Sequence, residues 1–498
     1  MNTKLLEALR SLNPLEQNHF TDFVNSPYHN KRQRSVHCWQ YFQNFAPDYD
    51  SNQISIQALG KHLFPTQSFK RQAVLDEISH LYRLIKSFWE AEGLQADPFL
   101  QRSLRLQQLS ERGMNRLYSI ERKAAQKLLA EKAPDLEEAY KYKLAWSTLD
   151  NEHFGRQQTR TVDTSLAQKL EAMDVYFLVL ILRESCEASN RQHILNAQYQ
   201  LPLLNPLLQL LRDPSHPYRQ VPLINLYYHA YLSLQDEADE TSYEALLKTL
   251  RKYRDQLSEI EKRSMYKFAQ NFCIRQINSG QAGYHQRLFE LFQEVLQEKI
   301  IYEEGKLSHT NFKNIVTIGL RVKAFDWVEH FLENQIRQVD LPFRENVYAY
   351  CRAALEVEIG QTQKAIRRLN SISHTDVHYQ ISARQLLFKI YYFDQDYEAA
   401  LYTISAFRHF VQRNQELPKA RKEYYTRYLN HCKALCLLQE RWPAYSKPEA
   451  QMRRKKLQTK VESSAPLANR NWLLEELARF ERSAARNAQP YLRNGSSS

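Results

Sequence analysis

Residues 381–414 read ISARQLLFKIYYFDQDYEAALYTISAFRHFVQRN, and this stretch decides the fold. Leu387 and Tyr391 lie four residues apart, and so do Ala400 and Ile404. Side chains at this spacing share one face of an α-helix, which they can bury against a neighbouring helix. We therefore predict two helices, at 376–393 and 395–414, that pack as a pair with Ala400 at their closest approach.

Helix pairs of this kind recur along the preceding part of the chain. Apolar periodicity predicts pairs at 217–235 and 239–255, 258–278 and 284–302, 308–322 and 324–338, and 342–359 and 361–371, followed by a single helix at 419–438. The second helices align on five small or apolar residues, separated by 43, 40, 37 and 35 positions: Ala245, Leu288, Val328, Ala365 and Ala400. A period of roughly 34–45 residues built from two helices indicates an α-solenoid.

The repeat at 381–414 resembles a tetratricopeptide repeat. The matching positions are Leu387, Tyr391, Tyr397, Ala400 and Ile404, then Ala353, Gly360, Ala365 and Leu369 in the preceding unit, and Phe325, Val328 and Leu332 in the one before. Phe388 and Phe407 stand where the family has small residues. The resemblance covers about 215–438 and implies an all-α, right-handed α-α superhelix. The basic and asparagine residues with which some family members clamp a peptide carboxylate are not matched, so the resemblance implies no such ligand.

Glycine is scarce, with 10 residues in a chain of 498. Glycine is costly inside helices, so its scarcity favours a continuous helical architecture. Helix-start signals such as Asn13-Pro14-Leu15-Glu16 extend this prediction to an irregular helical N-terminal region. A helix predicted at 163–197 is continuously apolar over 175–182, which indicates burial on all sides. No apolar run approaches the roughly 20 residues of a membrane span.

These patterns predict a domain organisation in six parts. We expect an N-terminal helical domain at 1–150, a long buried helix and connector at 151–214, TPR-like helix pairs at 215–440, a basic flexible linker at 441–468, an amphipathic helix at 469–486 and a disordered tail at 487–498.

The positive charge is concentrated near the C-terminus. The formal net charge is +12, and residues 401–498 contribute +11 of it, with 19 basic and 8 acidic side chains. The densest run is Arg453, Arg454, Lys455 and Lys456, with Lys460 shortly after it. Such asymmetry favours an acidic or polyanionic partner.

The helix predicted at 469–486 has an apolar stripe made of Trp472, Leu473, Leu477 and Phe480. In one interpretation, this helix folds back and caps the open end of the solenoid, as terminal repeats generally require. In the other, it docks into a groove on a partner, and the basic run attracts RNA, the ribosome or an acidic protein.

Motifs of catalysis are missing from the sequence. The patterns GxxxxGK[ST], GxGxxG, HExxH and GxSxG do not occur. Adjacent acids such as Glu137 and Glu138 point about 100° apart on a helix, so they do not form a facing dyad. We therefore predict a protein that is not an enzyme, with no catalytic residue and no cofactor.

Two histidine or cysteine pairs have a spacing that could hold a metal. Cys432 and Cys436 share a helix face, and His374 and His378 flank Asp376. The first pair is typical of small core residues, and the second group is typical of polar residues at a helix start. We predict no metal site.

Six scattered cysteines without a CxxC pair indicate reduced thiols in a cytoplasmic protein. Residues 20–31, FTDFVNSPYHNK, are similar to a segment of a family of Bacteroidetes-type bacterial proteins. That resemblance implies a bacterial cytoplasmic protein and brings no activity with it.

The leading hypothesis is a protein–protein interaction scaffold. The first helices of the solenoid would line its concave face and offer Gln385, Lys389 and Tyr392 to a protein or peptide. The alternative is an RNA- or ribosome-associated protein that acts through the basic C-terminal segment. The sequence does not predict an oligomeric state.

Overall fold

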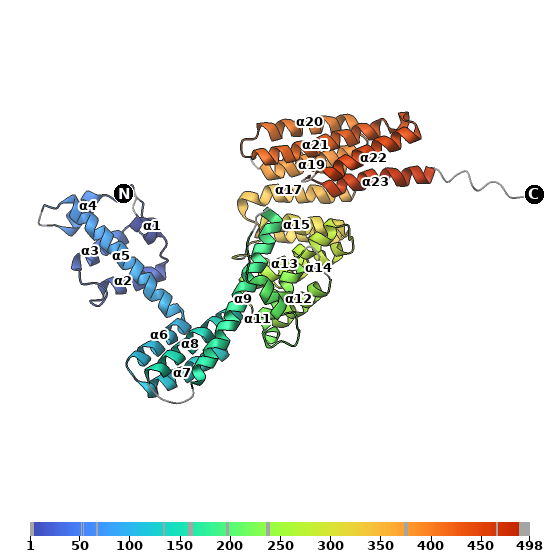
Figure 1. The fold of residues 1–498 in the computed structure, drawn as a ribbon. Helices are drawn as coiled ribbons and strands as arrows, with labels where there is room; N and C mark the ends of the chain where they lie inside the picture. The colour runs from blue at the N-terminus through green and yellow to red at the C-terminus, as the bar shows by residue number, and fades with distance from the viewer. Residues whose placement is uncertain are drawn as a thin grey trace, which may run out of the picture. The chain divides into compact units, whose positions relative to one another are not determined.

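The fold was analysed in a computed structural model, which describes residues 4–50, 52, 54–65, 68–132, 135–157, 163–195, 199–235, 240–372, 377–464 and 467–487. These residues form α-helices, four short 3₁₀ helices and no β-strand, so this part of the chain is all-α as predicted (Figure 1). Within the same ranges, no helix combines the length and the apolar character that crossing a lipid bilayer requires.

The chain divides into two compact units, Met1–Leu180 and Ile181–Ser498. The division falls inside α9 (Thr164–Leu195), whereas the sequence predicted a boundary at about residue 150. Helix α8 (Leu136–Arg156) continues through the start of that expected boundary. The centre of α9 is not buried on all sides as predicted, because Val179 is fully buried but Phe177 is 50% exposed.

Two separate cores are found among the described residues of helices α1 to α8 in the first unit. Helices α1 (Lys4–Arg10), α2 (Pro14–Asn25), α3 (Gln33–Gln43), α4 (Ile56–Leu63) and α5 (Arg71–Ala96) share one core around Phe20 and Trp39. Helices α6 (Pro98–Glu111), α7 (Asn115–Lys132) and α8 share another around Trp146. The predicted start of α2 is confirmed, since Asn13 and Glu16 form a reciprocal capping box.

The second unit begins with the end of α9 and α10 (Leu204–Leu210) and continues as helix pairs. The pairs are α11 (Pro222–Ser233) with α12 (Glu240–Tyr253), α13 (Glu259–Asn278) with α14 (Tyr284–Gln297), α15 (His309–Arg321) with α16 (Phe325–Gln335), α17 (Leu341–Glu358) with α18 (Thr362–Asn370), and α19 (Val377–Phe393) with α20 (Tyr397–Arg413). Each second helix also packs against the first helix of the next pair, and α20 packs against α21 (Lys419–Glu440). The predicted helix pairs are therefore confirmed to within a few residues at each end.

Close packing within the pairs explains why the aligned positions of the second helices hold small or apolar residues. Leu288, Val328, Ala365 and Ala400 are buried, and only Ala245 is half-buried. Gly319 of α15 lets α16 approach, because a Cβ atom there would lie 2.6 Å from Cγ2 of Val328. Gly360 turns the chain between α17 and α18 at a φ of +79°, a conformation that favours glycine.

Two further helices complete the second unit. Helix α22 (Lys447–Ser463) packs against α21, and α23 (Arg470–Asn487) packs against both α21 and α22. The short 3₁₀ helices are η1 (Pro217–Gln220), η2 (Arg254–Gln256), η3 (Ile336–Gln338) and η4 (Trp442–Ala444).

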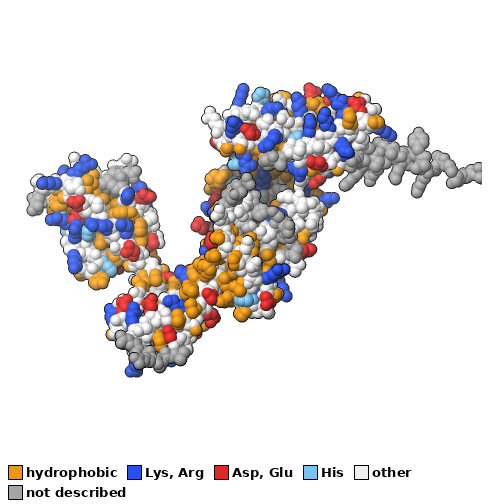
Figure 2. All heavy atoms as spheres, viewed as in Figure 1, with side chains coloured by type: hydrophobic (Ala, Val, Ile, Leu, Met, Phe, Trp, Pro, Cys, Tyr) orange, Lys and Arg blue, Asp and Glu red, His pale blue; other side chains and the backbone are white. Residues whose placement is uncertain are grey.

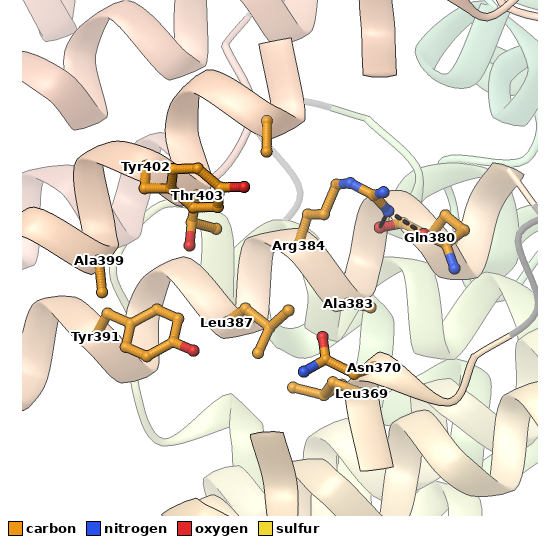
Figure 3. A pocket seen from close by; sticks show the side chains of 11 residues that line it. Leu369, Asn370, Gln380, Ala383, Arg384, Leu387, Tyr391, Ala399, Tyr402 and Thr403 are labelled. Carbon is orange, nitrogen blue, oxygen red and sulfur yellow. Dashed lines mark hydrogen bonds between the residues drawn. The ribbon is translucent and has the colours of Figure 1, made fainter. Parts of the chain in front are cut away.

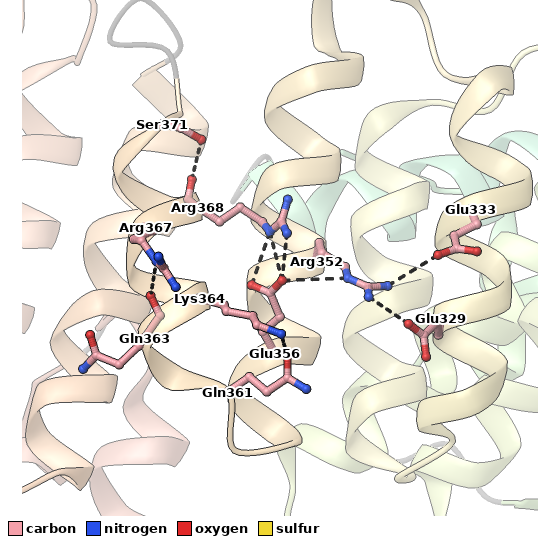
Figure 4. Close-up of polar contacts among 10 residues, drawn as sticks. All are labelled: Glu329, Glu333, Arg352, Glu356, Gln361, Gln363, Lys364, Arg367, Arg368 and Ser371. Atoms are coloured by element: carbon pink, nitrogen blue, oxygen red, sulfur yellow. Dashed lines mark hydrogen bonds and ion pairs between the residues drawn. The ribbon is translucent and has the colours of Figure 1, made fainter.

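A network of ion pairs around a buried carboxylate joins the three helices α16, α17 and α18 (Figure 4). Glu356 of α17 is 3% exposed, and its Oε1 lies 2.8 Å from Nη2 of Arg368 on α18. Arg352, one turn before it, lies 3.9 Å from the same oxygen and reaches Glu329 of α16 at 2.8 Å. This network fixes α17 against its neighbours on both sides.

We expect Glu356→Gln to lower the free energy of unfolding by about 3 kcal/mol, because it leaves Arg368 and Arg352 without their shared carboxylate. Chemical denaturation followed by circular dichroism measures the change. Glu358→Gln, on the exposed face of the same helix, is the matched control and is expected to change stability by less than about 0.5 kcal/mol. Equal effects of the two substitutions would contradict the role of the network.

Candidate functional site

The C-terminal helix α23 docks on the helix pairs of its own chain. Trp472 is 7% exposed and lies in one core with Phe388 and Tyr392 of α19. Its ring centroid is 5.8 Å from that of Phe388 and 5.6 Å from that of Tyr392, and both pairs meet edge to face. Phe388 is one of the two positions that depart from the tetratricopeptide pattern, and its large ring supplies part of this contact.

Lys389 completes this contact, which we call the Trp472 interface: Phe388, Lys389 and Tyr392 of α19 with Trp472 of α23. Its Nζ lies 4.8 Å from the Trp472 ring centroid, a cation–π geometry. Burial, with a smaller contribution from the charge of Arg321, lowers the pKa of Lys389 from 10.5 to about 8. Cys432, Glu475 and Glu476 act in the opposite direction on this pKa.

The structure thus brings together two sets of residues that the sequence predicted as separate binding surfaces. Lys389 and Tyr392 were expected on an open concave face, but Tyr392 is only 2% exposed and faces α23. Gln385 on the same helix is half-buried. Leu473 and Leu477 are buried in the same core as Trp472, and Phe480 is half-buried, with its ring 4.7 Å from that of Trp442.

The basic segment is helical over most of its length, where the sequence predicted a flexible linker at 441–468. Pro448 suits the first turn of α22, and Leu457 and Val461 bury one side of the helix. These two apolar residues lie four apart, but the surrounding charges obscured that pattern in the sequence.

The basic run separates into members with different surroundings. Arg454 is 6% exposed and donates hydrogen bonds from Nη1 to the carbonyl oxygen of Leu477 on α23 (3.3 Å) and from Nε to Gln451 (3.1 Å). Arg453 pairs with Glu449 at 2.9 Å. Lys455, Lys456 and Lys460 are exposed.

A large cavity lies where α23 approaches α13, α14 and α15, and we call it the α15–α23 groove. Its volume is about 1200 Å³. Asn314, Thr317 and Arg321 line it from one face of α15, since they are three and four residues apart. Its other walls mix apolar and polar side chains: Ile274, Ile277, Asn278, Leu288, Phe292, Asn471 and Trp472.

A smaller cavity of about 320 Å³ lies among α18, α19 and α20 (Figure 3). Arg384 hydrogen-bonds to Gln380 inside it and stacks on Phe410, with its guanidinium carbon 4.3 Å from the ring centroid. Burial lowers the pKa of Arg384. The Arg384 guanidinium is thus already hydrogen-bonded to Gln380 and stacked on Phe410. This cavity therefore offers a ligand fewer available polar groups than the α15–α23 groove does.

The two candidate metal pairs have different outcomes. Cys432 and Cys436 are buried in the core that holds Trp472, and burial raises the pKa of both thiols. His374 and Asp376 lie outside the described residues. Among the residues that are described, no three His, Cys, Asp or Glu side chains gather in a metal-binding arrangement.

Sequence reasoning missed the α15–α23 groove, although part of its signal was present. The polar positions 314, 317 and 321 follow one helix face, but their partners on α13, α14 and α23 are far away in the chain. Nothing in the local pattern shows that α23 returns to this surface.

Comparisons of the chain with known protein families, with curated proteins and with solved structures gave no match. The resemblances to tetratricopeptide repeats and to a bacterial protein family therefore stay predictions from the residues quoted above.

We expect Trp472→Ala to lower the free energy of unfolding by about 3 kcal/mol, because it leaves a cavity against Phe388 and Tyr392. Asn471→Ala, at an exposed neighbouring position, is the control and is expected to change stability by less than about 0.5 kcal/mol. Guanidinium denaturation measures both. An unchanged stability of Trp472→Ala would contradict the docking of α23.

The lowered pKa of Lys389 predicts a pH-dependent stability. Between pH 8 and 10.5 the folded state releases the Lys389 proton while the unfolded state keeps it, so wild-type stability rises with pH through this window. Relative to Lys389→Met, the wild type should gain up to about 1.4 kcal/mol per pH unit.

Urea denaturation of both proteins at several pH values in this window measures the gain. Lys433→Met removes an exposed lysine of α21 and is the matched control, for which we expect no such trend relative to wild type. A pH-independent difference between wild type and Lys389→Met would contradict the buried position of the ammonium group.

Proposed function

We propose that this protein is a non-enzymatic protein–protein interaction scaffold whose helix pairs form a right-handed TPR-like superhelix. The observation that supports it best is the α15–α23 groove, with a volume of about 1200 Å³. The groove combines apolar side chains such as Ile277 and Phe292 with hydrogen-bonding ones such as Asn314. This mixture suits an extended peptide, whose backbone needs polar partners and whose side chains need apolar contacts.

The order of helix contacts supports the superhelix. Each second helix lies between the first helix of its own pair and the first helix of the next, which is the packing that stacked repeats need to bury a continuous core. First helices also contact one another, as α15 contacts α17 and α17 contacts α19. On this proposal, the first helices line the inner face, and Asn314, Thr317 and Arg321 belong to it.

We also propose a cytoplasmic location. All six cysteines are buried and free of disulfides, which suits a reducing compartment. Burial raises the pKa of Cys38 and Cys351 above that of an ordinary thiol, so these side chains stay protonated and suit a packing role.

Filling the groove tests the scaffold. Peptides are first selected from a random library for binding to the wild-type protein. These peptides should bind the Thr317→Trp variant at least about tenfold more weakly than they bind the wild type, because the indole occupies the groove. Calorimetry on individual selected peptides measures the affinity.

Thr459→Trp is the matched control. Thr317 and Thr459 are both exposed helix residues whose hydroxyl donates to the carbonyl four residues earlier, at 2.8 and 3.1 Å. Thr459 is not part of the groove lining. Selected peptides that bind all three proteins equally would refute the proposed use of this groove.

A further inference from the structure

A second groove, which we call the α21–α22 groove, runs along the seam between α21 and α22. Its volume is about 500 Å³. Helix α21 contributes Asn430, His431, Ala434, Leu437, Leu438 and Arg441, and α22 contributes Arg453, Lys456, Leu457 and Lys460. Lys and Arg side chains stand among hydrophobic ones over the C-terminal helices at the top of Figure 2.

The charge of this groove is of one sign. Four cationic side chains line it, namely Arg441, Arg453, Lys456 and Lys460, and no aspartate or glutamate is among its lining residues. Arg453 has an ion pair with Glu449 at 2.9 Å. The other three form no ion pair among the described residues, so their charge is available to a ligand. A lysine already affects the site electrostatically, because Lys460 lowers the pKa of His431 together with burial.

The floor of the groove is apolar. Ala434 and Leu437 are half-buried there, beside the more deeply buried Leu438 and Leu457. Of the two aromatic rings in the lining, Tyr445 has the guanidinium of Arg453 over its ring at 4.6 Å, and His431 is half-buried and hydrogen-bonds to Ser464 at 3.0 Å. That face of Tyr445 is therefore covered and does not offer a stacking platform for a nucleobase.

We propose that the α21–α22 groove binds an acidic amphipathic peptide segment of a protein partner. The apolar side chains of the peptide would pack on the floor of the groove, and the carboxylates of the peptide would pair with Arg441, Lys456 and Lys460 at its rim. The apolar floor and the covered tyrosine favour this ligand over single-stranded nucleic acid, which relies on phosphate contacts together with aromatic stacking. This surface is additional to the α15–α23 groove of the proposed scaffold.

The charge of the C-terminal sequence argues against its occupying this groove. Residues 481–498 carry three arginines and a single glutamate, so their net charge has the same sign as the groove. An acidic segment from another protein satisfies the charge complementarity that this tail lacks.

Two adjacent lysines provide the experiment. Lys456 lines the groove, whereas Lys455 is also exposed on the same helix but is not part of the lining. The probe is a fluorescein-labelled peptide with leucine at every third or fourth position and glutamate between them, and fluorescence anisotropy measures its binding to the full chain. Lys456→Glu should weaken binding about tenfold, and Lys455→Glu by less than about twofold.

Three further measurements decide the class of ligand. The same peptide with serine in place of leucine should bind more weakly than the leucine peptide. Oligouridylate of equal net charge should bind more weakly than the serine peptide. The variant Thr317→Trp should bind the leucine peptide with the same affinity as the wild type. The proposal is overturned if the leucine peptide does not bind, if both lysine variants lose affinity equally, if serine replaces leucine without loss, or if oligouridylate binds more tightly. A loss in Thr317→Trp would overturn the independence of the two grooves.

Discussion

The return of α23 onto its own chain is the contact on which both grooves of the second unit depend. Trp472 inserts between residues of α19, and Lys389 places its ammonium group against the indole. Helix α23 then covers Tyr392 and Phe388, which are 2% and 1% exposed. A terminal helix with this role needs one apolar face and one polar face, and the apolar stripe of α23 meets the first requirement.

Local periodicity predicted the helix pairs well because each pair is built from contacts close in sequence. Val328 and Gly319, for example, lie nine positions apart and meet across one turn. The Trp472 interface joins residues separated by eighty or more positions, and no local pattern specifies such a contact. The apolar stripe of the C-terminal helix allowed such a return, and the large ring of Phe388 at a position of small residues is consistent with an additional packing partner.

The basic run shows a second limit of sequence reasoning. Its total charge is evident from composition, but four consecutive residues on a helix point in different directions. Arg454 faces α23, Arg453 and Lys456 line the seam with α21, and Lys455 does neither. The four consecutive basic residues therefore do not form one cationic patch. One makes a structural contact, two line a groove, and one is exposed outside it.

Both grooves follow from the same return of the chain. To bring α23 back against α21, the chain first runs along α21 as α22, and the seam between these two helices becomes the cationic groove. Helix α23 then supplies one wall of the α15–α23 groove through Asn471 and Trp472. Disturbing Trp472 would therefore act directly on the α15–α23 groove, which it lines. It would act indirectly on the α21–α22 groove, through the core that Trp472 shares with Leu438 and Leu457 and through the hydrogen bond from Arg454 to the Leu477 carbonyl. The two grooves share no lining residue, so a ligand can bind to each one separately, although one terminal helix creates them both.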